Sequence, residues 1–267
     1  MAPSGDFSSL PLIAGVDLTG KVAIVTGAGM GVGRATSRVL AQAGCSVVAA
    51  DIDHEAAKRT VVEIEAAGFS AIAVPTDVAR RVHAERLAQA AIEAYGTIDI
   101  LANVAGIYPS SLVVDMDEAE WDRVFAVNIK GVFNCCKAVA PTMIARRSGK
   151  IVNVASTDGM HPGIFSGQSG YGNAHYCASK GAVITFTKSL AAELAPYGIN
   201  VNAISPGWVA TEKALAGGRF EEGLRHVPLG RGARTEEVGQ AILFLVSDAA
   251  GFMTGENLVF SGGSVMD

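Results

Sequence analysis

The chain has 267 residues, of which 49% are hydrophobic and 18% are charged, and its net charge at pH 7 is −5. This length and composition suit a single large α/β domain with an extensive core. The acidic balance argues against a nucleic-acid partner, because such binding depends on neutralising phosphates with lysine and arginine.

Residues 1–18 contain neither a basic start nor a long apolar run, so we expect no signal peptide and interpret them as an extension before the first strand. No stretch of the sequence is apolar for long enough to predict a membrane span. The four cysteines lack the spacing of metal ligands. We interpret them as reduced core thiols of a cytoplasmic protein and predict no metal site.

From residue 21 onward, apolar runs alternate with segments of helical periodicity. The runs are continuous rather than alternating, as expected for strands that are covered on both faces. They occupy residues 21–26, 45–50, 70–75, 98–103, 150–155, 199–205 and 257–260. Helical patterns include residues 32–44 and 81–96, with longer ones around 118–145 and 175–196. This order predicts one α/β domain over residues 19–267, a doubly wound parallel sheet of the Rossmann type with helices on both faces.

Ligands of such sheets bind at the carboxyl ends of the strands, and the first of these ends carries the glycine-rich stretch "TGAGMGVG" from Thr26 to Gly33. Glycines let the backbone approach a pyrophosphate, and the N-terminus of the following helix supplies free N–H groups. Chance is a serious alternative, because the chain holds 31 glycines. The position between strand and helix favours a nucleotide site. The expected contacts are Gly27, Met30, Gly31, Val32 and Gly33.

Asp51 ends the second predicted strand. A carboxylate at this place can accept hydrogen bonds from both ribose hydroxyls of the adenosine and would repel a 2′-phosphate. The sequence therefore favours NAD over NADP. The alternative is a plain strand-end or turn residue, as Asp53 would be.

Residues 171–180 read "YGNAHYCASK" and offer two tyrosines as proton carriers. To act as a base near neutral pH, a tyrosine needs a pKa about three units below its usual ~10, and burial acts in the opposite direction. Tyr176 and Lys180 share one helix face, and lysine stays charged at neutral pH. We therefore predict Tyr176 as the base and Lys180 as the cation that lowers its pKa. Tyr171 lies among glycines and is expected to shape the pocket.

A tyrosine and lysine at this spacing are more often a solvated pair, so the assignment depends on the other motifs. Together these motifs resemble the classical short-chain dehydrogenase/reductase family from about Leu18 to Val265. They are "TGAGMGVG", Asp51, "TDV" at 76–78, "NVAG" at 103–106, Asn128 in "VNIKG", Ser156, Tyr176 with Lys180, and "PGWVAT" from Pro206.

The resemblance implies an NAD(P)-dependent alcohol–carbonyl conversion with Asn128, Ser156, Tyr176 and Lys180 as the catalytic group. It also implies cofactor contacts beyond the first loop. These are Asp77, Val78, Asn103, Ala105, Gly106, Tyr176, Lys180, Pro206, Gly207, Val209 and Thr211. A homotetramer is the assembly expected for this family.

The sequence departs from the family pattern at two places. Val104 stands where the family often has a second asparagine. The connection from Ser156 to Tyr176 is longer than usual, and its extra residues fall within 160–172. Spacing alone would favour Tyr171 over Tyr176 and leaves Ser169 as a rival serine. The lysine after Tyr176 and the strand before Ser156 decide against both, and we expect the insertion to border the substrate.

The loops around this site are mostly apolar, which favours a hydrophobic or aromatic secondary alcohol or ketone as the substrate. Tyr108, His161, Phe165 and Trp208 are the main candidates for substrate contact, with Ile107, Pro109, Met160, Ile164 and the segment to about Pro228 nearby. The main hypothesis is an NAD-dependent oxidoreductase. The alternatives are an NADPH-dependent biosynthetic ketoreductase and a non-catalytic dinucleotide-binding protein.

Overall fold

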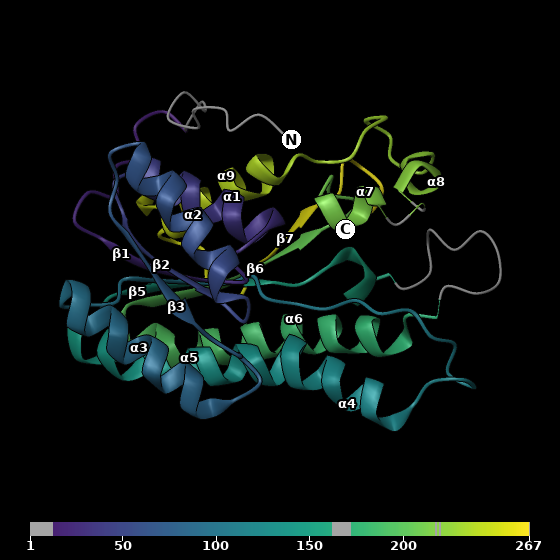
Figure 1. The fold of residues 1–267 in the computed structure, drawn as a ribbon, viewed down its shortest axis with the longest axis horizontal. Helices are drawn as coiled ribbons and strands as arrows, with labels where there is room; N and C mark the ends of the chain where they lie inside the picture. The colour runs from purple at the N-terminus through teal and green to yellow at the C-terminus, as the bar shows by residue number, and fades with distance from the viewer. Residues whose placement is uncertain (1–12, 162–171, 217, 219, 267) are drawn as a thin grey trace.

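A computed structural model describes residues 13–161, 172–216, 218 and 220–266. Its centre is a parallel sheet of seven strands in the order β3-β2-β1-β4-β5-β6-β7, seen almost edge-on in Figure 1. The strands are β1 (Val22–Thr26), β2 (Ser46–Asp51), β3 (Ala71–Pro75), β4 (Ile100–Asn103), β5 (Gly149–Val154), β6 (Ile199–Pro206) and β7 (Asn257–Phe260).

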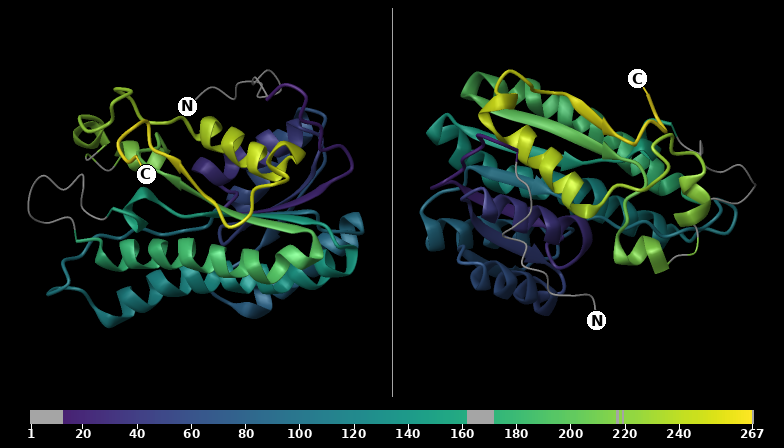
Figure 2. Two further views of the ribbon diagram at one scale, coloured as in Figure 1. Left: turned by 180° about the vertical axis from the view of Figure 1, so that it is seen from behind. Right: turned by 90° about the horizontal axis from the view of Figure 1, so that it is seen from above.

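Helices cover the sheet in two layers, which Figures 1 and 2 show from three directions. One layer holds α1 (Gly31–Gln42), α2 (His54–Ala66) and α9 (Thr235–Val246). The other holds α3 (Arg81–Tyr95), α4 (Glu118–Phe125), α5 (Gly131–Arg146) and α6 (Ala174–Leu194). Two short helices, α7 (Glu212–Ala216) and α8 (Phe220–Leu224), lie beyond the carboxyl end of β6. A π-helical segment, η2 (Ala126–Lys130), joins α4 to α5, and 3₁₀ turns are formed by η3 (Thr157–Gly159), η4 (Ala195–Tyr197) and η5 (Asp248–Ala250).

Each central strand contributes side chains to two hydrophobic cores, one on each face of the sheet, because successive side chains point to opposite faces. In β1, Ala23 and Val25 pack towards α1 and α9, whereas Val22 and Ile24 pack towards α3 and α5. Ile24 is fully buried, so its truncation to alanine would cost roughly 2–5 kcal/mol. Burial on both faces is why the strands appear in the sequence as continuous apolar runs.

The predicted doubly wound sheet is confirmed, and every predicted strand is present with its ends shifted by at most two residues. The largest shift is at residues 98–103, where β4 begins only at Ile100. The preceding Asp99 is held by other bonds, since its carboxylate accepts the N–H of Val22 at 2.9 Å and pairs with Arg146. At the N-terminal side, Leu18 is already buried against the core.

The sheet order reverses between β1 and β4, and a crevice opens beyond the strand ends at such a reversal. The loops after these two strands meet there. A Cβ added at Gly27 would lie 2.9 Å from Cα of Ala105. The fold therefore brings the glycine-rich loop and the "NVAG" loop together at one edge of the sheet.

Candidate active site

The glycine-rich loop is shaped by backbone that only glycine adopts easily. Gly27 and Gly31 have φ angles of 66° and 50°. A Cβ at Gly33 would overlap the carbonyl oxygen of Gly27. Helix α1 starts at Gly31, and among the described residues of its first turn none is acidic. Its N–H groups and positive dipole end thus face the crevice, which is the arrangement that binds a phosphate.

Asp51 lies directly against this loop. Its Oδ2 accepts the N–H of Gly29 at 2.8 Å, and its Oδ1 accepts the N–H of Asp53 at 2.9 Å. Each carboxylate oxygen keeps capacity for another donor. Asp53 instead caps α2 by accepting the N–H of Ala56 at 3.0 Å. The two aspartates, similar in sequence, therefore differ in role: one borders the crevice and the other stabilises a helix.

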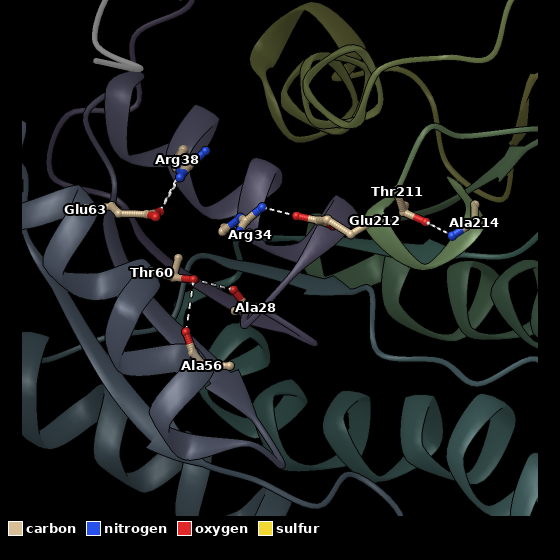
Figure 3. Close-up of polar contacts among 9 residues, drawn as sticks. All are labelled: Ala28, Arg34, Arg38, Ala56, Thr60, Glu63, Thr211, Glu212 and Ala214. Atoms are coloured by element: carbon tan, nitrogen blue, oxygen red, sulfur yellow. Dashed lines mark hydrogen bonds and ion pairs between the residues drawn. The ribbon is translucent and has the colours of Figure 1, made fainter. Parts of the chain in front are cut away.

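A buried side chain of α2, that of Thr60, holds the loop in place, as Figure 3 shows. Thr60 is fully buried, and its hydroxyl donates to the carbonyl oxygen of Ala28 at 2.8 Å. On the other side of the loop, the hydroxyl of Thr26 accepts the N–H groups of Val104 and Ala105 at 3.0 and 3.1 Å. The loop is thus fixed before any ligand binds.

Asn103 reaches away from the crevice. Its Nδ2 donates to Oδ1 of Asn153 at 2.9 Å inside the sheet. Asn103 can therefore line a cofactor cleft only through its backbone, while Ala105 lies opposite Gly27. Asp77 and Val78 occupy the turn after β3. There the Asp77 carboxylate accepts the N–H of Ala79 at 3.0 Å.

Asn128 lies in the π-helical segment η2 and is buried. Its Oδ1 accepts the N–H of Ile107 at 2.9 Å, and its Nδ2 donates to Oγ of Ser179 at 3.0 Å. A Cβ at Gly106 would lie 3.4 Å from Nζ of Lys180 and 3.5 Å from Oδ1 of Asn128. The structure therefore brings Asn128 and Lys180 to the same side of the "NVAG" loop.

Ser156 follows β5, and Tyr176 lies in the first turn of α6. Their side chains form a hydrogen bond. The Ser156 hydroxyl also accepts the N–H of Asp158 at 3.1 Å. Sequence spacing left two tyrosines open, and the structure places Tyr176 at the serine.

The expected lowering of the Tyr176 pKa by Lys180 is wrong. Burial raises the pKa of Tyr176 above its ordinary value, and the hydrogen bond from Ser156 only partly opposes this. Burial also lowers the pKa of Lys180 to about 8. The Lys180 ammonium donates to the carbonyl oxygen of Val154 at 2.7 Å instead of to the phenol. Desolvation therefore outweighs the proximity of the cation.

Of the predicted substrate residues, Tyr108 is brought to the site. Its ring lies edge-on to the ring of Tyr176 at 6.2 Å between centroids, and 44% of the residue is exposed. Thr211 hydrogen-bonds its hydroxyl, and Nζ of Lys213 lies 4.3 Å from its ring centre. Tyr108 thus bridges Tyr176 and α7.

The other candidates lie elsewhere or outside the described residues. Trp208 packs edge-on against Phe220 of α8 at 6.1 Å and closely over Gly223 of the same helix, so it supports α8. His161 is anchored through its backbone N–H to Thr157 at 2.9 Å. Ile164, Phe165, Ser169, Tyr171 and most of the 160–172 insertion fall outside the described residues.

The segment after β6 covers the start of α1. A Cβ at Gly31 would lie 3.3 Å from Cγ2 of Thr211. Arg34 of α1 forms an ion pair with Glu212, the first residue of α7, as Figure 3 shows. This segment follows Pro206, Gly207 and Val209. The N–H of Gly207 donates to the carbonyl oxygen of Phe260, and Val209 forms a β-bridge with Ala233. No pattern in the sequence predicts the Arg34–Glu212 pair, because long-range contacts between single charges follow no spacing rule.

A separate groove of about 900 Å³ lies between α6, β7 and the C-terminal segment. Met160 lines it and accepts a hydrogen bond from Nδ2 of Asn257 at 3.0 Å. The groove lining, taken over the described residues, excludes Ser156 and Tyr176. Across all the residues that the structure describes, no group of three or more His, Cys, Asp or Glu side chains could hold a metal ion. Among the same residues, no helix is both long and apolar enough to span a bilayer.

Comparison with known proteins places this site in a family. The family model described as enoyl-(acyl carrier protein) reductase matches residues 27–264. The chain is 41% identical over 252 residues to the 3-oxoacyl-[acyl-carrier-protein] reductase FabG of Thermotoga maritima, covering 93% of this chain and 99% of that protein. It is 40% identical over 251 residues to the 3-oxoacyl-[acyl-carrier-protein] reductase of a Synechocystis strain, covering 93% and 98%.

Solved structures agree. The crystal structure of a short-chain type dehydrogenase/reductase from Mycobacterium marinum matches with a TM-score of 0.89 at 33% identity, over 94% of this chain and 98% of that one. The crystal structure of gox2181 matches with a TM-score of 0.88 at 33% identity, over 93% and 97%. The chain therefore belongs to the short-chain dehydrogenase/reductase family of oxidoreductases.

Proposed function

We propose that the protein is an NADH-dependent ketoreductase that reduces the ketone of a 3-oxoacyl thioester to the corresponding secondary alcohol. The observation that carries this proposal is the Ser156–Tyr176 hydrogen bond beside the buried Lys180. The names of the relatives, 3-oxoacyl-[acyl-carrier-protein] reductases, support the biosynthetic ketoreductase over a general alcohol dehydrogenase.

The crevice fits a nicotinamide dinucleotide. Its glycine-rich loop leaves no room for side chains at the glycines. A Cβ at Gly29, for example, would lie 2.9 Å from Oδ2 of Asp51. The uncapped N-terminus of α1 suits the pyrophosphate, and Asp51 suits two ribose hydroxyls. A 2′-phosphate beside this carboxylate would add like charges at close range. Asp51 therefore supports NAD as the cofactor.

The chain's own residues supply proton and orientation. Ser156 donates a hydrogen bond to the substrate carbonyl oxygen, and Tyr176 delivers its hydroxyl proton to that same oxygen. A nicotinamide cofactor, when bound, would supply the hydride for the carbonyl carbon, so that one hydride and the Tyr176 proton would convert C=O into CH–OH. Because burial raises the pKa of Tyr176, the hydroxyl keeps its proton at neutral pH, which suits an acid in ketone reduction.

Lys180 and Asn128, which both lie beside Gly106, support the transfer of hydride and proton. In this proposal Lys180 holds the nicotinamide ribose. The amide of Asn128 fixes the backbone at Ile107 through hydrogen bonds in both directions. A dinucleotide-binding protein without catalysis would have no use for this set of four side chains. Their assembly at one strand end supports an enzyme.

An NAD-dependent dehydrogenase of aromatic secondary alcohols is the second candidate. The half-exposed ring of Tyr108 beside Tyr176 favours it, since an aromatic face there would pack on an apolar substrate.

A substrate panel separates the two candidates. The panel pairs acetoacetyl thioesters of coenzyme A and of acyl carrier protein with aromatic ketones, each with NADH and with NADPH. Oxidation of NADH is followed by absorbance. Preference for the thioesters supports the proposal, preference for aromatic ketones supports the second candidate, and turnover of none of these ketones overturns both.

A further inference from the structure

The turn after β3 lies beside the carboxylate that is proposed to hold the adenosine ribose. Asp51 pairs with the last residue of β3, and the N–H of Thr76 donates to the carbonyl oxygen of Asp51 at 2.7 Å. Asp77 and Val78 follow directly. In the proposed cofactor site, residues 76–80 therefore border the adenosine end, and the shape of this turn affects how that end binds.

Hydrogen bonds from α3 and α5 hold the turn in place. From α5, Nδ2 of Asn134 donates to the carbonyl oxygen of Val78 at 2.9 Å. From α3, Nδ1 of His83 accepts the N–H of Asp77 at 3.2 Å. The Asp77 carboxylate accepts the N–H of Ala79 within the turn itself. The imidazole ring thus fixes the backbone at the residue that begins the bend.

The bond to His83 exists in one protonation state of the ring. Nδ1 can accept an N–H only while it keeps a lone pair, so the ring must be neutral with its proton on Nε2. In the imidazolium form both ring nitrogens are donors, and Nδ1 would direct a proton at the N–H of Asp77. Histidine is the side chain whose charge commonly changes between pH 5 and 8. Because His83 is partly exposed, its ring can take a proton from water, and that proton breaks the bond.

His83 is the one histidine among the described elements around this turn. Helix α3 packs against α5 and against β1, β2 and β3. Glu85 pairs with Arg81 at 2.7 Å, so it is engaged away from the ring. No second histidine of these described elements contributes to a titration between pH 5 and 8. The charged side chains of these elements and of the turn are Asp51, Asp77, Arg80, Arg81, Glu85, Arg86, Glu93, Lys137 and Arg146, and the other titratable ones are Tyr95, Cys135 and Cys136.

We propose that His83 is a positioning residue for the adenosine end of the cofactor site: its neutral ring holds the Asp77 turn in the binding conformation, and protonation of the ring releases the turn and weakens binding. The inference rests on the proposed NAD site and adds a pH control to it. The bond involves neither Ser156 nor Tyr176, so its loss acts on cofactor affinity rather than on the chemical step. When the binding conformation is only partly populated, the apparent Kd rises in inverse proportion to that fraction.

The probe for this inference is ADP-ribose, which carries the adenosine end and the pyrophosphate of NAD but no nicotinamide. It has no group that titrates between pH 5.5 and pH 8, so a change in affinity over this range belongs to the protein. Calorimetry gives the Kd of ADP-ribose at both pH values for the unmodified protein and for each variant. The measurement needs no turnover.

Three variants separate the hydrogen bond from other effects of pH. His83→Asn is the conservative one, because the amide Oδ1 stands where the imidazole Nδ1 stands, accepts the Asp77 N–H and gains no proton in this range. His83→Ala removes the acceptor at every pH. His54→Gln is the matched control, since His54 begins α2 close to Asp51 and is the histidine on the other side of the adenosine end.

For the unmodified protein we expect the Kd of ADP-ribose to be about three- to tenfold weaker at pH 5.5 than at pH 8, the range that one hydrogen bond supplies. His83→Asn should bind equally well at both pH values, and as tightly as the unmodified protein does at pH 8. His83→Ala should bind weakly at both. His54→Gln should keep the pH dependence of the unmodified protein.

Nitrogen NMR of the imidazole rings at pH 8 gives an independent check, with His83→Asn used to assign the signal. The bond requires the proton on Nε2, and a proton on Nδ1 would overturn the inference. It would also be overturned by ADP-ribose binding that does not change with pH, or by a pH dependence that persists in His83→Asn or disappears in His54→Gln. Absence of ADP-ribose binding at either pH would instead overturn the proposed cofactor site, and this inference with it.

Discussion

The ammonium group of Lys180 lies 5.8 Å from the centre of the Tyr176 ring and gives its hydrogen bond to a backbone carbonyl. Burial therefore acts on the two partners in opposite directions: it raises the pKa of the phenol and lowers that of the ammonium. Both effects favour neutral forms, so the pair alone does not create a phenolate. In the proposed ketone reduction, Tyr176 therefore holds a proton that it can donate at neutral pH.

Tyr176→Phe should lower kcat by at least a hundredfold while leaving the Kd for NADH within about threefold, since the ring remains and only the proton is lost. Turnover and fluorescence titration of bound NADH check the two parts.

Tyr171→Phe is the matched control, because the sequence offered both tyrosines. We expect it to keep most of the activity. The reverse pattern, with Tyr171→Phe inactive and Tyr176→Phe active, would show that the wrong tyrosine has been assigned.

Lys180 should make stability depend on pH. Its pKa is about 8 in the folded protein against 10.5 as the ordinary value. Between these values the unfolded chain binds the proton and the folded chain does not, so stability rises with pH through this window. Below pH 8 the full cost of burying the charge is present.

Lys180→Met should therefore increase the free energy of unfolding by about 2 kcal/mol at pH 7, with the gain shrinking above pH 8. Urea unfolding at pH 7 and pH 10 measures it. The same variant should lose activity. Lys188→Met, exposed on the same helix, is the control, and an equal response of both variants would contradict the expectation.

Asp51→Ala should reduce the preference for NADH over NADPH by roughly tenfold or more, because it removes both the ribose acceptor and the repulsion of a 2′-phosphate. The ratio of kcat/KM for the two cofactors is the measurement. Asp53→Ser is the control, since serine keeps a cap for α2 while removing a charge two residues away. Comparable use of both cofactors by the unmodified enzyme would contradict the assignment of Asp51.

Exposed apolar residues on α4 and α5 form a candidate interface for the expected homotetramer. On α5, Phe133 is 43% exposed and packs edge-on against Phe186 of α6, at 6.5 Å between ring centroids. Trp121, on the preceding α4, is 39% exposed. An apolar patch of this kind on a folded chain commonly marks an interface.

Phe133→Lys should shift the protein to smaller species by light scattering at micromolar concentration. Val62→Lys is the control, because Val62 is 62% exposed on α2, on the opposite layer. A stable monomer before any substitution would remove the prediction of a tetramer.

The sequence predicts the elements of this fold well because its signals are local. Continuous apolar runs mark strands that are buried on both faces, and the run predicted at residues 257–260 has the same bounds as β7. The glycine-rich loop could be predicted too, since Gly27 and Gly31 meet conformational needs that few other residues satisfy. Tyr176 was separated from Tyr171 by the lysine one turn later, again a local spacing.

What could not be predicted depends on contacts between distant segments. Whether Asn103 faces the crevice or the sheet is decided by Asn153, and nothing near Asn103 in the sequence encodes it. The sign of the Tyr176 pKa shift depends on burial by several elements, which a helical spacing does not report.

The π-helical turn at Ala126–Lys130 sets a constraint on chain length rather than on residue type. Helices α4 and α5 run into each other through it, and it carries Asn128. A π turn amounts to one residue more than a regular α-helix would hold, and each α-helical residue turns the chain by about 100°. Deletion of any one residue here would turn α4 and α5 into one regular helix. The deletion would rotate either the Asn128 amide or all of α5 away from its present position. Substitutions outside Asn128 keep this register, whereas insertions and deletions in the stretch shift it.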